Sequence, residues 1–226
     1  MEFLSSMVSF LLLIQVFNLI IPAASLSGNE TDLLALLDFK NQISDDPNGI
    51  LKSWNASKHH CQWFGVTCGQ NQRVIGLNLF GQSLVGSISP HVGNLTFMNF
   101  INLRNNRFFG EIPKEVGRLF QLTYLNLTNN SLGGEIPVTL SNCSQLKTID
   151  ILRNRLVGNI PFELGSLKKL KSLFLGRNNL TGEIPKSIGN LTSLTQIYLS
   201  YNNLEGHLPE ELGQLTSLYS IGIDVN

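Results

Sequence analysis

The chain has 226 residues, of which 42% are hydrophobic and 14% are charged, so an ordered core is expected and a disordered chain is excluded. Sixteen Lys and Arg residues balance sixteen Asp and Glu residues. This balance removes any general electrostatic argument for binding nucleic acid or an anionic membrane surface.

An apolar run occupies residues 8–21, and small residues follow it at 23–25. This order is typical of a secretory signal peptide, so residues 1–25 are predicted to be one, cleaved near Ser25 or Ser27. The run is too short to span a bilayer, and no second run of about 18 apolar residues exists. The mature chain is therefore expected to enter the secretory pathway, to reach the extracellular space and to insert in no membrane.

Residues 28–73 precede the regular part of the sequence and are predicted to form an N-terminal cap. Residues 31–43 show the periodicity of an amphipathic helix, and Glu30 and Asp32 suit its N-terminus. Trp54 and Trp63 supply further apolar surface. The cap is expected to cover the first repeat of the segment that follows.

Three cysteines remain after the signal peptide. Cys61 and Cys68 lie close together, and secretion permits a disulfide between them, which we favour. The alternatives are two free thiols or a metal-binding pair with His59 and His60, although zinc sites normally show two ligand pairs. Cys143 occupies a position that is leucine in most of the repeats and is expected to be a buried free thiol.

From residue 74 the sequence repeats every 24 residues in the pattern LxxLxLxxNxLxGxIPxxLGxL, with six complete repeats at 74–217 and a truncated seventh at 218–226. One repeat cannot bury its Leu and Ile residues alone, so the repeats are expected to stack. The predicted fold class is an α/β repeat solenoid, a right-handed leucine-rich-repeat solenoid whose xLxLx stretches form a concave parallel sheet.

Three further columns of the repeat are interpreted as structural. An inward asparagine is expected to bond backbone groups, a glycine to fit a turn, and a proline to lie where no N–H is needed, as at a sheet edge. The asparagines are Asn106, Asn130, Asn154, Asn178 and Asn202, with Gln82 in the first repeat. The glycines are Gly86, Gly110, Gly134, Gly158, Gly182 and Gly206, and the prolines are Pro113, Pro137, Pro161, Pro185 and Pro209.

The last repeat stops at Asn226, so Ile221 and Ile223 are expected to face an open apolar edge. On this pattern the chain is interpreted as the N-terminal portion of a longer solenoid.

Eight N-x-S/T sequons support a glycosylated extracellular protein. One of them, Asn126, falls on a concave strand, where a glycan would cover part of the surface. The sequons are at Asn29, Asn55, Asn94, Asn126, Asn129, Asn142, Asn179 and Asn190.

The segments CQWFGVTC, GSISPHVGNLTF, GEIPKEVG, LTGEIPKSIGNLTSL and NNLEGHLPEELGQL resemble the ectodomain of plant leucine-rich-repeat receptor kinases. The resemblance covers residues 28–226 and is greatest to the subfamily of the flagellin and elongation-factor sensors and the rice bacterial-blight resistance receptor. It implies a plasma-membrane receptor that binds a peptide or protein outside, together with a co-receptor, and signals through an internal Ser/Thr kinase. This chain has few repeats and no kinase motif, so no kinase residue is carried over. An arginine pair with which some related receptors hold a peptide carboxylate has no matching strand position here.

The predicted ligand strip lies on the concave strands, where exposed aromatic pairs would give rigid contact area and two neighbouring arginines would attract an acidic group. Scattered exposed aromatics are also normal on protein surfaces, so each of them has a purely structural alternative. The strip is Phe100, Tyr124, Arg153, Phe174, Arg177, Tyr198 and Tyr201.

No catalytic, cofactor-binding or metal-binding motif is found, so the chain itself is not expected to be an enzyme or to need a cofactor. The favoured function is the ligand-binding ectodomain of a receptor kinase, truncated before its membrane span, and so an inactive or decoy product as it stands. The alternatives are a self-contained secreted repeat protein, such as an inhibitor of cell-wall-degrading enzymes, or a small co-receptor.

Overall fold

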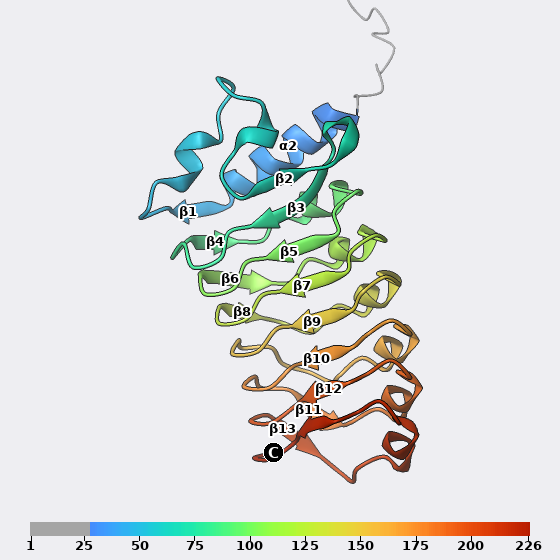
Figure 1. Ribbon diagram of the computed structural model, residues 1–226. Coiled ribbons are helices and arrows are strands. Elements are labelled where there is room, and N and C mark those ends of the chain that lie inside the picture. Colours follow the sequence, from blue (N-terminus) through green and yellow to red (C-terminus); the bar gives the residue numbers. More distant parts are fainter. Residues whose placement is uncertain (1–27) are drawn as a thin grey trace, which may run out of the picture.

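The structure is a computed structural model that describes residues 28–226, so the signal peptide predicted at 1–25 lies outside the described residues. The chain forms a single stack of coils, with the helical cap at one end and the C-terminus at the other (Figure 1). Within the described part, no helix is both long enough and apolar enough to cross a membrane.

The cap contains the one α-helix of residues 28–226, α2 (Gly28–Asn41), which begins three residues earlier and ends two residues earlier than predicted. Ala35, Leu36 and Phe39 form its buried face and pack on the first coils. The other cap elements are β1 (Ile43–Asp45), η1 (Ile50–Ser53), η2 (His60–Gln62), β2 (Val66–Cys68) and η3 (Gln70–Gln72), where η marks a 3-10 helix.

The larger sheet has eight strands, and its members follow one another down the stack in chain order (Figure 1). Every pair is parallel and offset by 24 residues, except that the cap strand β2 pairs antiparallel with β3. The predicted concave parallel sheet is therefore present. Its repeat strands are β3 (Val74–Asn78), β5 (Phe100–Asn102), β7 (Tyr124–Asn126), β9 (Thr148–Asp150), β10 (Ser172–Phe174), β12 (Gln196–Tyr198) and β14 (Ser220–Gly222).

A second set of strands, which the repeat pattern did not predict, follows the ladder asparagines. Three repeats extend the cap strand β1 into a four-stranded sheet, and two later repeats form a separate parallel pair. The repeats thus hydrogen-bond to one another along two lines. The strands are β4 (Val85–Ser87), β6 (Arg107–Glu111) and β8 (Ser131–Gly133), then β11 (Thr181–Glu183) and β13 (Asn203–Glu205).

The prolines of the repeat lie at the start of 3-10 helices on the outer side, which corrects the predicted sheet-edge position. Each has φ near −63° and its carbonyl accepts a bond from three residues on, as Val116 N–H donates to Pro113 at 3.0 Å. Proline thus fixes the backbone angle that begins a tight turn. The helices are η4 (Pro90–Asn94), η5 (Lys114–Arg118), η6 (Val138–Asn142), η7 (Phe162–Ser166), η8 (Lys186–Asn190) and η9 (Glu210–Gln214).

Glycine is required in its column for two different physical reasons, depending on the repeat. Gly110, Gly134, Gly158, Gly182 and Gly206 have left-handed φ between 68° and 79°, as the turn interpretation requires. Gly86 does not, and a Cβ there would instead collide with the carbonyl oxygen of Gln42, which passes directly above it in the cap. The first glycine of the column therefore lets the cap approach the first coil closely.

The core is a continuous column of buried Leu, Ile, Val and Phe side chains that runs from the cap through the repeats. Cys143 is a buried free thiol within it, and burial raises its pKa to about 11. At the last repeat, Ile221 is 50% exposed and Ile223 is partly buried.

The ladder asparagines join successive coils, and Asn178 is representative. Its Nδ2 donates to the carbonyl of Leu175 at 2.8 Å and to that of Ile151, one coil earlier, at 3.1 Å. Its Oδ1 accepts from the buried N–H of Leu156 at 3.1 Å. Gln82, in the first repeat, donates to the carbonyl of Phe80 and accepts from Asn48 of the cap at 3.4 Å, so it makes none of the bonds between repeats that the asparagines make.

Candidate functional site

The candidate site is the concave, solvent-facing side of the larger sheet, called the inner face below. No helix of the described chain covers it (Figure 1). Strand register places the predicted aromatic pairs side by side, with Phe100 opposite Tyr124 and Phe174 opposite Tyr198. All four are half-buried rather than fully exposed. Register therefore agrees with the predicted neighbours, but the surface that they offer is smaller than the sequence suggested.

The reason is that two of the rings cover glycines of neighbouring coils. The ring of Phe100 occupies the space that a Cβ on Gly76 would fill. The ring of Tyr198 lies against Gly222 and against Gly176, where a Cβ would come within 2.6 Å of it. Phe100 and Tyr198 thus protect backbone that glycine leaves open, whereas Tyr124 and Phe174 are not among the nearest neighbours of any glycine in residues 28–226.

At the end of each concave strand, one residue before the ladder asparagine, the backbone is left-handed. Asn105 and Asn129 tolerate this conformation, but Arg153, Arg177 and Tyr201 also adopt it, with φ of 53°, 55° and 60°. The three are exposed. The Arg177 guanidinium carbon lies 4.3 Å from the centroid of the Tyr201 ring, so the two form one cation–π pair at this edge of the sheet.

The Asn126 sequon lies on a concave strand, but the residue is only 3% exposed. Its Nδ2 donates to Tyr124 Oη at 2.9 Å and to Asp150 Oδ2 at 3.0 Å, and its Oδ1 accepts from Thr128 N–H. The Thr128 hydroxyl also donates to Asp150. This network occupies the amide to which a glycan would be attached.

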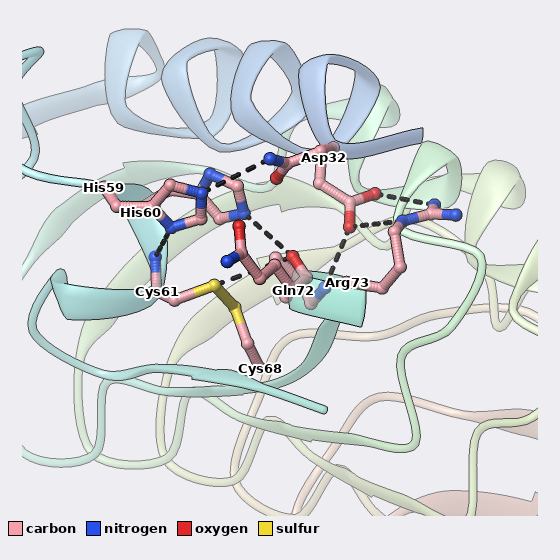
Figure 2. Close-up of polar contacts among 9 residues, drawn as sticks. Asp32, His59, His60, Cys61, Cys68, Gln72 and Arg73 are labelled. Atoms are coloured by element: carbon pink, nitrogen blue, oxygen red, sulfur yellow. Dashed lines mark hydrogen bonds and ion pairs between the residues drawn. A yellow bond between two sulfur atoms is a disulfide. The ribbon is translucent and has the colours of Figure 1, made fainter. Parts of the chain in front are cut away.

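The cap holds a buried ion pair between α2 and the residue before β3 (Figure 2). Asp32 on α2 is fully buried, and its two carboxylate oxygens accept from Arg73 Nε and Nη2, both at 2.9 Å. It also accepts from Val74 N–H at 2.8 Å. Asp32 therefore ties α2 to β3, a role that the helix N-terminal position expected from sequence did not indicate.

Beside this pair, Figure 2 shows His59, His60 and Cys61, which within residues 28–226 are the three side chains grouped closely enough to suggest a metal site. Cys61 is joined to Cys68 in a disulfide, so its sulfur is not available as a thiolate ligand. His59 Nδ1 accepts from Cys61 N–H, and its Nε2 faces Asn29 Nδ2. The cluster is accounted for by disulfide and hydrogen bonds.

His60 is the buried member of the cluster. Its Nε2 lies 3.3 Å from the carbonyl of Gln72, which can only accept, so this nitrogen carries the proton. Burial, together with the neighbouring His59, lowers the pKa of His60 below its ordinary value of 6.5. His60 is therefore a neutral, structural histidine at pH 7.

Two family models match the sequence. One is described as a leucine-rich repeat region and matches residues 110–226, more than half of the chain. The other is described as a leucine rich repeat N-terminal domain and matches residues 29–69. The second falls within the predicted cap.

Individual proteins match in part. The LRR receptor-like serine/threonine-protein kinase EFR of Arabidopsis thaliana is 52% identical over 83 residues, 36% of this chain and 8% of that protein. The Arabidopsis receptor kinase HAESA, solved with the peptide hormone IDA and the co-receptor SERK1, superposes with a TM-score of 0.78 at 33% identity over 85% of this chain and 33% of that one. The BIR2 ectodomain of Arabidopsis thaliana gives a TM-score of 0.69 at 33% identity, covering 78% of this chain and 95% of that one.

Proposed function

Because the chain belongs to the leucine-rich-repeat family, we propose that residues 28–226 form the ligand-binding part of an extracellular receptor. The observation that carries the proposal is the uncovered face of the larger sheet, where Tyr124 and Phe174 are half-exposed without a glycine to cover. Rigid aromatic side chains of this kind give contact area at a small entropic cost. The partner we propose is a peptide or a protein segment.

The likeness to HAESA supports this partner class, because that receptor was solved with a peptide hormone and a co-receptor. The chain covers a small share of the receptor kinases that it matches, so kinase signalling belongs to the proposal for a longer protein. For residues 28–226 themselves we propose binding without catalysis.

An extracellular location is part of the proposal. The Cys61–Cys68 disulfide is stable in an oxidising compartment, and the exposed sequons at Asn142, Asn179 and Asn190 could carry glycans without disturbing the core. The predicted signal peptide at 1–25 would direct the chain there.

The test is selection of a random peptide library on the secreted protein, followed by affinity measurements on two variants. Tyr124→Ala with Phe174→Ala removes the two aromatics that carry the proposal, and Phe120→Ala with Phe162→Ala removes two exposed aromatics elsewhere. Selected peptides should lose at least tenfold in affinity for the first variant and little for the second. The opposite ranking, with both variants folded by circular dichroism, would reject the inner face as the binding site.

A further inference from the structure

The charge of the chain is balanced overall but not locally. Residues 141–180 contain seven Lys and Arg against two Asp and Glu, a net charge of +5, whereas the rest of the chain carries nine against fourteen, a net charge of −5. Residues 141–180, which hold the fourth repeat and the concave strand of the fifth, therefore form a basic zone within a chain that is otherwise acidic. The seven residues are Lys147, Arg153, Arg155, Lys168, Lys169, Lys171 and Arg177.

Four of these charges lie at the two ends of neighbouring concave strands. Lys147 and Lys171 come directly before β9 and β10, and the backbone N–H of Lys171 donates to the carbonyl of Lys147 at 2.8 Å. Arg153 and Arg177 follow the same two strands, and all four are exposed. Six residues of extended chain span at most about 20 Å, so two basic pairs flank a patch of roughly that width.

No carboxylate of the described chain forms an ion pair with these groups. The ion pairs found in residues 28–226 are Arg73–Asp32, His91–Asp38 and Lys186–Glu211, and none of them involves the basic zone. The ammonium groups of Lys168 and Lys169 bond neutral oxygens.

The zone contains two carboxylates. Asp150 lies on β9 opposite Phe174 and accepts hydrogen bonds from Asn126 and Thr128, whose neutral groups leave its charge in place. Glu163 lies on η7, on the outer turns. The four basic residues of the two strands therefore face one carboxylate, and because like charges at neighbouring positions of a sheet repel one another, a partner can supply the missing negative charge.

We propose that the inner face of the fourth and fifth repeats binds an acidic peptide segment in which carboxylates flank an apolar side chain. This inference rests on the proposed function and adds the chemical class of the ligand. Phe174 lies on the strand between Lys171 and Arg177 and has no hydrogen-bonding group, so an apolar side chain is its natural contact. A polyuronate would supply carboxylates but no such side chain, which is why a peptide is favoured over an acidic polysaccharide.

The experiment uses three synthetic nonapeptides, XXXSLSXXX, with X as Glu, Gln or Lys, and fluorescence anisotropy with the purified secreted protein at low salt. The Glu peptide should bind at least tenfold more tightly than the Gln peptide, and the Lys peptide more weakly than either. Raising the salt from about 50 to 500 mM should reduce the preference, because exposed charges are screened. Equal affinity for the Glu and Gln peptides would overturn the proposal.

A matched pair of variants locates the effect. Lys171→Gln with Arg177→Gln removes two charges beside Phe174, and Lys114→Gln with Arg118→Gln removes two exposed charges on η5. The first should weaken Glu-peptide binding about tenfold and the second less than twofold. Equal effects of the two variants would refute the assignment to the inner face. If polygalacturonate binds more tightly than the Glu peptide, and loses affinity in the Lys171→Gln with Arg177→Gln variant, a peptide is the wrong class of ligand.

Failure of the acidic-peptide proposal can be told apart from failure of the proposed function. If library-selected peptides still require Phe174 but the Glu peptide shows no preference, only the acidic class is wrong.

Discussion

Replacing Asn178 by alanine tests how the stack of coils is held together. The substitution removes the acceptor of the buried Leu156 N–H and the donor to the carbonyls of Ile151 and Leu175. Each hydrogen bond contributes about 1 kcal/mol net, and a buried donor left unpaired adds about 1 kcal/mol more. We therefore expect the free energy of unfolding to fall by about 3–4 kcal/mol.

The assay is urea unfolding followed by far-UV circular dichroism, because both tryptophans, Trp54 and Trp63, lie in the cap and their fluorescence would report that end alone. Gln82→Ala is the matched control, since Gln82 occupies the same column but makes only exposed hydrogen bonds, to the carbonyl of Phe80 and from Asn48. Its cost should be about 1 kcal/mol or less. Asn178→Asp should be at least as harmful as Asn178→Ala, because it keeps the acceptor but turns a carboxylate oxygen toward two carbonyls. If Asn178→Ala unfolds within about 1 kcal/mol of the wild type, the interpretation of the column as an inter-coil tie is wrong.

Three other predictions concern the cap and the inner face. Asp32→Asn should lower the free energy of unfolding by about 3 kcal/mol, because it breaks a buried ion pair. Asp38→Asn, at the exposed contact with His91, should change it by less than about 0.5 kcal/mol. Equal effects of the two variants in urea titrations would contradict this difference. Asn126 should be unmodified in mass spectra of the secreted protein while exposed sequons such as Asn179 carry glycans, since its amide is buried and bonded; full occupancy would show that the network around Asp150 does not form. The unfolded chain takes up a proton at His60 near pH 6.5 and the folded chain only at lower pH, so the stability contributed by neutral His60 is present above pH 6.5 and is lost as pH falls below it. His60→Gln should therefore reduce the drop in melting temperature between pH 7 and pH 5. An unchanged drop would exclude His60 as its source.

Much of the fold could be predicted because the 24-residue period constrains every coil to repeat the same contacts. The spacing of Ile101, Leu125 and Ile149 was enough to place three strands in register, and their burial follows. The second line of strands was missed because its outward positions, such as Arg107 and Phe109, show no regular alternation of polar and apolar residues. Its pairing comes from backbone bonds that any residue type can make.

The candidate site was less predictable than the fold. The sequence placed Phe100 and Tyr198 on the inner face, but a residue column cannot reveal that a ring fills the space above a glycine one coil away. Asp32 was similarly misread, because its partner Arg73 is 41 residues distant and lies outside the helix that the periodicity identified. The signal that could have found it is a lone acid on the apolar side of a predicted helix, which requires a buried cation.

The left-handed column of Arg153, Arg177 and Tyr201 sets a limit on engineering this scaffold. Each of these side chains holds a backbone angle that asparagine adopts more easily, at a cost of about 1 kcal/mol per position. A consensus design with asparagine throughout, as at Asn105 and Asn129, would gain thermal robustness. It would also remove the positive charges of Arg153 and Arg177 and the Tyr201 ring that contacts Arg177, so in these three neighbouring repeats a gain in stability would cost ligand-binding groups.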